Sequence, residues 1–99
     1  MTDDRGTPTW TFLTNHGHVL VCIARDPDVR LRDVATKVGV TERAVQSIVR
    51  DLEDGGYLER TRVGRRNHYR LDPGRPLRHP VERDHRIAEL LAALTSGDS

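Results

Sequence analysis

The apolar positions of residues 40–56 recur at the spacing of an α-helix and define the clearest element of the chain. One stripe follows the i, i+3, i+4, i+7 pattern: Val45, Ile48, Val49 and Leu52. Thr41 is a suitable N-cap for this helix, and Gly55 with Gly56 ends it. The polar side carries groups that can hydrogen-bond base edges and phosphates: Arg43, Gln46, Ser47 and Arg50.

A shorter amphipathic segment precedes this helix. Its apolar stripe consists of Leu31, Val34, Ala35 and Val38. Gly39 ends the segment, and two helices joined by a short turn that contains glycine form a helix-turn-helix pattern. A further helix is expected from about residue 15 to residue 25. Thr14 or Asn15 would cap it, and Pro27 would end it, since the residue before a proline disfavours helix.

The pattern changes from helical to strand-like after residue 56. Residues 57–63 and 67–71 contain β-branched and aromatic positions and are joined across residues 64–66, which predicts a β-hairpin. The predicted inward side chains are Tyr57, Leu58, Tyr69 and Leu71, and the outward ones are Arg60, Arg62, Arg65, Arg66 and Arg70. Such arginines can simply keep an exposed strand edge soluble. Glycine between arginines at the tip favours contact with a nucleic-acid backbone and the minor groove.

Residues 1–14 are predicted to form an N-terminal arm. Within it, the apolar residues 10–13 fit either a short strand or an arm packed on a neighbour, and the sequence leaves both open.

The C-terminal part is predicted to be a linker and a helix. Residues 72–80 contain three prolines and predict a stiff linker, residues 81–95 a last helix and residues 96–99 a tail. The helix carries an apolar stripe: Ile87, Leu90, Leu91 and Leu94. This stripe can fold back on the same domain, but its place beyond a stiff linker favours a dimer interface.

Length and charge narrow the possibilities. With 99 residues and 35% hydrophobic content, the chain fits one small domain. The net charge is only +1, but residues 55–71 contain five arginines against one glutamate, whereas residues 1–54 hold seven basic and nine acidic groups. The positive charge is therefore local, and a patch of this kind can attract phosphate even when the total is near zero.

Metal, thiol and catalytic chemistry find little support in the sequence. Cys22 is the only cysteine, and although it stands at i+4 from His18, a lone cysteine in an apolar run is more often core. The repeat of His79, Glu82 and His85 drifts round a helix, so we expect no metal site and no cofactor. No nucleophile with a base, paired carboxylates or phosphate-binding glycine loop stands out, which argues against an enzyme.

Nothing in the sequence predicts membrane insertion. The longest apolar run, residues 19–24, is far below the roughly 20 residues of a membrane helix, and the N-terminus is acidic rather than a signal peptide. We expect a cytoplasmic, nucleoid-associated protein.

Taken in order, these segments resemble winged helix-turn-helix transcriptional regulators of the MarR and ArsR type. The resemblance covers roughly residues 15–71. It rests on the segments 31–35, 38–41, 44–53, 56–60 and 63–71, taken in this order and spacing. It implies an α+β, mainly α fold, with a three-helix core, a hairpin wing and an additional C-terminal helix. Arg32 stands where relatives often cap the second helix with Ser or Thr, which makes a phosphate contact its expected role. The ligand sets of metal-sensing relatives are not matched.

The resemblance also implies where DNA would bind. The recognition helix would contribute Thr41, Glu42, Arg43, Gln46, Ser47 and Arg50. The wing and the phosphate contacts would involve Arg32, Arg62, Arg65, Arg66, Asn67 and His68. Because the last turn of the helix is acidic, we expect it to enter the major groove by its N-terminal half.

Two functions follow as hypotheses. The first is a homodimeric transcriptional regulator that binds double-stranded DNA at an inverted repeat, with any small-molecule effector unknown. The second is a winged-helix module for protein–protein interaction without sequence-specific DNA binding, which the near-neutral net charge would suit. A metal- or thiol-responsive form of the first, through His18 and Cys22, also stays open.

Overall fold

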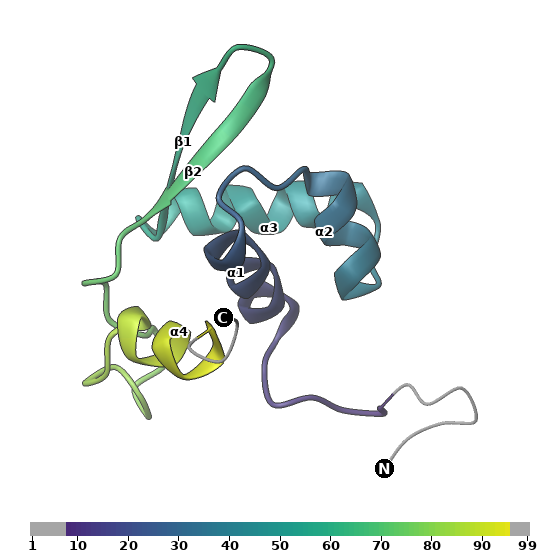
Figure 1. Cartoon of the computed structure of the whole chain (residues 1–99). Coiled ribbons are helices and arrows are strands. Elements are labelled where there is room, and N and C mark those ends of the chain that lie inside the picture. The colour runs from purple at the N-terminus through teal and green to yellow at the C-terminus, as the bar shows by residue number, and fades with distance from the viewer. Residues whose placement is uncertain (1–7, 96–99) are drawn as a thin grey trace.

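The computed structural model describes residues 8–95, which form four helices and one antiparallel hairpin (Figure 1). The order is α1 (Asn15–Arg25), α2 (Leu31–Val38), α3 (Glu42–Asp54), β1 (Leu58–Val63), β2 (Arg66–Leu71) and α4 (Ile87–Thr95). In Figure 1 the three N-terminal helices form the body, the hairpin projects from it as a wing, and α4 lies beside α1. This arrangement confirms the predicted winged architecture with a C-terminal helix.

The helix boundaries of the N-terminal half follow from local capping. Thr14 caps α1 by accepting a hydrogen bond from the amide of Gly17, and Thr41 caps α3 by accepting one from the amide of Ala44 at 3.0 Å. Helix α2 ends at Gly39, whose φ of 88° is a left-handed conformation that glycine adopts without strain. The turn that sets α2 against α3 therefore depends on this glycine.

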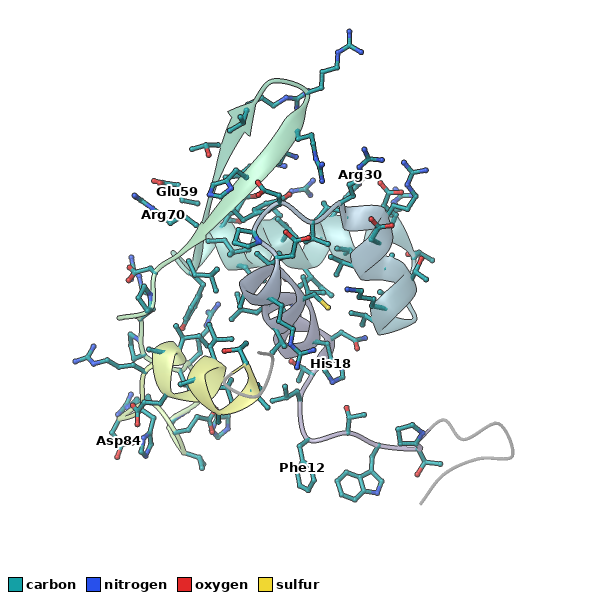
Figure 2. The ribbon with its side chains drawn as sticks, in the orientation of Figure 1. Phe12, His18, Arg30, Glu59, Arg70 and Asp84 are labelled. Atoms are coloured by element: carbon teal, nitrogen blue, oxygen red, sulfur yellow. The ribbon has the colours of Figure 1, made fainter. Side chains whose placement is uncertain are left out.

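The wing is a hairpin with a tighter turn than predicted. Val63 pairs with Arg66, so the loop is only Gly64 and Arg65, and Arg66 belongs to β2. Gly64 has a φ of 63°, as two-residue hairpin turns demand. Figure 2 shows Glu59 and Arg70 on the side of the hairpin away from α2, where the Arg70 guanidinium donates to the Glu59 carboxylate at 2.9 Å.

The core gathers side chains from every element. The predicted stripe of α3 is buried in full, together with Val19, Leu20 and Ile23 of α1, Val34 and Ala35 of α2, and Tyr57, Leu58 and Tyr69 around the wing. Tyr69 is only 1% exposed, and the amide of the same residue donates to the carbonyl of Pro27 at 2.9 Å. The base of the wing is thus held by the core and by the loop between α1 and α2.

The C-terminal segment departs from its prediction. Helix α4 begins at Ile87 rather than at residue 81, because residues 72–86 fold back on the domain instead of forming an extended linker. The amide of Leu77 donates to the carbonyl of His85, that of Ile87 donates to Arg75, and the Tyr57 hydroxyl donates to Pro76. Backbone groups that make these contacts cannot also make the hydrogen bonds of a helix. Helix α4 therefore begins only after this segment.

The stripe of α4 is largely used within one chain. Ile87 and Leu91 lie in the core of their own chain, at 5% and 9% exposure, so most of each side chain is already covered without a partner subunit. Leu90 and Leu94 remain half-buried. The fold-back alternative therefore holds for half of the stripe.

The start of α4 is fixed by Glu89. Its carboxylate accepts a hydrogen bond from the Arg86 amide at 2.7 Å and pairs with the His85 ring at 2.8 Å. The hydrogen bond to the Glu89 carboxylate raises the pKa of His85, and the same bond, with that from the Arg86 amide, lowers the pKa of Glu89.

This pair predicts a small pH dependence of folding. The His85 contribution is complete below the unfolded pKa of about 6.5 and is lost as pH rises through the raised folded value. The Glu89 contribution is complete above its unfolded pKa and is lost as pH falls through the lowered folded value. Thermal unfolding of wild type and His85→Gln should therefore differ most between these limits and converge at alkaline pH, whereas a constant difference would contradict the pairing.

The N-terminal arm is not a strand over residues 10–13. Its described part, residues 8–13, runs away from the helices in Figure 1, and Trp10 and Phe12 are 61% and 93% exposed. They contact each other edge to face, with centroids 5.1 Å apart. The predicted region 1–7 of the arm and the tail at 96–99 lie outside the described residues.

Candidate nucleic-acid interface

A groove of about 530 Å³ separates the wing from α3 and the start of α2. Six arginines line it, against three carboxylates: Arg30, Arg32, Arg50, Arg60, Arg65 and Arg66 against Asp28, Glu42 and Glu53. Helix, wing and loop each contribute arginines, so the positive charge of the concave face exceeds what the near-neutral total suggests. A face with positive charge on two opposed walls suits a polyanionic strand.

The predicted DNA-contacting residues of α3 are all exposed, but they divide into two groups. Glu42, Gln46 and Arg50 line the groove, as expected of side chains four residues apart on one helix face. Arg43 and Ser47 do not line it and occupy the adjoining outer face. Gln46 and Arg50 therefore lie on the face of α3 that borders the groove, next to the face that carries Arg43 and Ser47.

The wing residues divide in a similar way. Arg65 is at the turn and exposed, and Arg62 is exposed on β1 opposite Asn67, which lines the groove. Arg66 and His68 instead reach back to the loop between α1 and α2. The Arg66 guanidinium donates to the Asp28 carbonyl at 2.7 Å, and the His68 ring lies 2.8 Å from the Asp28 carboxylate.

These contacts give Asp28 a structural role in the interface. Together with the Tyr69 amide bond to Pro27, they tie β2 to the α1–α2 loop at three points. These contacts hold β2 of the wing against that loop. Arg66 and His68 stay predicted DNA contacts. Because both side chains contact Asp28, DNA would have to displace Asp28 or bind while these contacts stay intact.

Two of the three carboxylates at the end of α3 have a side-chain partner within the protein. The Arg60 guanidinium lies 3.4 Å from the Glu53 carboxylate, and the His16 ring lies 2.9 Å from that of Asp51. Glu53 lines the groove, so its pairing with Arg60 lowers the repulsion that a nearby phosphate would meet.

Helix α2 begins at Leu31, as predicted. Its N-cap residue is Arg30, whose side chain makes no capping hydrogen bond. Arg32 lies in the first turn, and both arginines line the groove; Figure 2 shows Arg30 at the end of α2 that faces the wing. Positive charge at the N-terminus of a helix opposes the helix dipole, and a bound phosphate would offset that cost.

Sequence reasoning left two groove arginines out of the predicted site. Arg30 precedes α2 and belongs to no periodic pattern, so only its position beside Arg32 could have pointed to it. Arg60 was expected among the outward wing arginines, and its place near α3 depends on how the hairpin twists over Glu53, which periodicity does not report.

The histidine and cysteine positions form no composite site. Cys22 packs against the core, and the His18 ring contacts the Asn15 side chain at 3.4 Å. His79 accepts a hydrogen bond from the Val81 amide, while His85 pairs with Glu89. Between residues 8 and 95, no three His, Cys, Asp or Glu side chains are grouped so that they could hold a metal ion.

No helix within the same range is both long enough and apolar enough to cross a membrane.

Comparison with known proteins agrees with this geometry. Residues 13–59 match the family model described as winged helix-turn-helix DNA-binding. This part of the chain is similar to winged helix-turn-helix DNA-binding domains. The matched range contains all of α1, α2 and α3 and the beginning of β1, so it includes the helix-turn-helix but stops short of the wing tip.

The winged helix-turn-helix fold is also that of a solved MarR family protein. The crystal structure of this Mycobacterium tuberculosis protein, a complex with salicylic acid, superimposes with a TM-score of 0.54 at 23% sequence identity. The alignment covers 85% of this chain and 58% of that protein, so this chain spans little more than half its length. No curated protein sequence matches the chain. The described residues thus have the winged helix-turn-helix fold of this MarR family protein.

Proposed function

We propose that this winged helix-turn-helix protein is a transcriptional regulator that binds an inverted repeat in double-stranded DNA as a homodimer. The observation that carries the proposal is the arginine-lined groove beside the exposed N-terminal half of α3. In this proposal α3 enters the major groove, and the backbone of the next strand passes between α3 and the wing.

The side chains of α3 divide the work of recognition. Arg43 and Arg50 have the fork geometry that pairs with guanine, and Gln46 has the amide that pairs with adenine. Thr41, Glu42 and Ser47 complete the set, since a carboxylate can accept a hydrogen bond from cytosine and a hydroxyl can contact more than one base. Base preference is therefore assigned to residues 41–50.

The groove arginines position the protein without selecting a base. Arg30 and Arg32 approach the backbone from the start of α2, and Arg65 approaches it from the wing. Arg62 lies outside the groove but is paired across the hairpin with Asn67, which lines it. Contacts to phosphate fix register and orientation and carry no direct sequence information. A dimer would present two such surfaces to half-sites about 10 bp apart.

A salt titration of duplex binding tests the proposal. The affinity of wild type for a random duplex should fall linearly with salt on logarithmic axes, with a slope near −0.9 for each phosphate neutralised. Arg65→Ala should reduce that slope by about one unit. The double variant Arg65→Ala/Arg66→Ala should reduce it by about two units if both reach phosphate, and by one if Arg66 stays on Asp28.

Arg70→Ala is the matched control. Arg70 lies on β2, as Arg66 does, but it pairs with Glu59 on the outer side of the wing. It should leave the slope unchanged. An absence of salt-dependent binding in wild type would instead support a protein-interaction module, the alternative that the near-neutral charge allows.

A further inference from the structure

The N-terminal arm and an apolar groove near it have complementary properties. The groove, of about 780 Å³, lies between α1, the end of α3 and the C-terminal segment. Its floor is apolar and includes Leu20, Leu52, Tyr57, Ile87 and Leu90. The arm carries two of the four aromatic residues of the chain, and the other two, Tyr57 and Tyr69, are buried.

The arm does not fill the groove of its own chain. Phe12 stands at the rim, yet its ring is 93% exposed, and Figure 2 shows it pointing away from the helices. The direction is set at the start of α1, where Thr14 caps the helix and the Thr11 hydroxyl donates to the Leu13 carbonyl at 2.7 Å. Two large rings are thus held out in solvent beside an apolar hollow.

We propose that Trp10 and Phe12 of one subunit insert into this groove of a second copy, and that the reciprocal exchange forms the dimer. The inference rests on the homodimer of the proposed function and assigns its contact surface. This apolar groove lies on the side of the domain formed by α1, α4 and the arm. Dimer formation there leaves the arginine-lined groove open for DNA.

The area and the polar groups fit this occupant. Each aromatic ring buries about 150–250 Å², so four exchanged rings and the surfaces they cover bury on the order of 1,200–2,000 Å² in total. That is the size of a standard stable interface. The Trp10 indole N–H needs an acceptor when buried, and carboxylates of Asp54 and Glu82 stand among the groove residues.

Trp10 is the only tryptophan, so its fluorescence reports the exchange directly. In wild type the emission should shift to longer wavelength on dilution, and the shift should follow the dimer-to-monomer transition measured by sedimentation velocity. Phe12→Ala should raise the dimer dissociation constant at least about 30-fold, as loss of a central aromatic contact does. Leu90→Gln, in the groove, should also weaken the dimer and shift Trp10 emission at a fixed concentration.

Val63→Ala is the control, since Val63 is an exposed apolar side chain on the wing and should leave the dimer unchanged. A dimer in which Trp10 emission is that of exposed indole would overturn the proposal. So would a buried Trp10 whose emission is independent of concentration, which would place the arm in its own groove, or a wild-type chain that stays monomeric.

DNA-binding measurements distinguish an error in the proposed dimer surface from an error in the proposed function. The variant Trp10→Ala/Phe12→Ala should still bind a single half-site with wild-type affinity and lose its advantage on an inverted repeat. If it keeps that advantage, the dimer exists but is formed elsewhere. If wild type itself has no advantage on an inverted repeat, the homodimeric function is wrong.

Discussion

Replacing Arg43 and Gln46 together with alanine is expected to abolish most of the discrimination between operator and random DNA. Each bidentate contact to a base edge discriminates by about 1–3 kcal/mol, which is roughly 5- to 150-fold in relative affinity per contact. Both side chains are exposed on the N-terminal half of α3, so their removal disturbs neither the buried stripe nor the Thr41 cap. The loss should therefore appear in recognition rather than in folding.

The measurement is a pair of fluorescence anisotropy titrations, on the selected operator and on a scrambled duplex of equal length. Affinity for the scrambled duplex should change little, apart from the loss of one positive charge. Arg83→Ala is the matched control, because Arg83 is an exposed arginine of the C-terminal segment away from the groove. An equal loss of affinity for both duplexes would show that α3 contributes charge but does not read bases.

Replacing Tyr69 with alanine is expected to lower the free energy of unfolding by about 3–5 kcal/mol, the cost of removing a large buried aromatic side chain. Tyr69 is the largest of the fully buried side chains, and it holds the base of the wing against the helices. In a small domain, a loss of this size removes much of the total stability. Chemical denaturation followed by circular dichroism measures it.

Two conservative variants separate ring from hydroxyl. Among residues 8–95 the Tyr69 hydroxyl finds no hydrogen-bond partner, so Tyr69→Phe should leave stability unchanged or raise it. The Tyr57 hydroxyl donates to the Pro76 carbonyl, so Tyr57→Phe should cost about 1 kcal/mol. A large loss in Tyr69→Phe would mean that the hydroxyl is satisfied and that the ring alone does not account for the effect.

The helical part of the fold could be predicted from the sequence because its determinants are local. The 3.6-residue period of Val45, Ile48 and Leu52, the Thr41 cap and the terminal glycines act within a few residues of each other, and the structure has α3 where they indicate. The hairpin was recognisable for the same reason, although its turn proved one residue shorter.

The C-terminal part could not be predicted in this way. Three prolines between residues 72 and 80 indicate a stiff segment, but its path depends on contacts with distant groups, such as the Tyr57 hydroxyl with Pro76. Those contacts delay the start of α4 and turn Ile87 and Leu91 into core residues. A stripe of leucines reports that a helix face is buried, without reporting what covers it.

The interface was foreseeable in outline and not in its pairings. Exposed arginines on the wing and a polar face on α3 follow from pattern, and the side chains predicted to read bases do lie on the exposed face of α3. The attachment of Arg66 and His68 to Asp28, and of Arg60 to Glu53, joins residues far apart in the chain. An arginine that is paired within the protein has to give up that contact, or share it, when it binds a phosphate.

The most direct test of the account is selection of bound duplexes from a random pool by the wild-type protein. The account predicts an inverted repeat whose half-sites lie about 10 bp apart, since two copies of α3 must enter the major groove on one side of the DNA. Arg43→Ala or Gln46→Ala should blur specific positions within each half-site. Recovery of no enriched sequence, or of a motif that these variants select unchanged, would contradict the assignment of α3 as the reading helix.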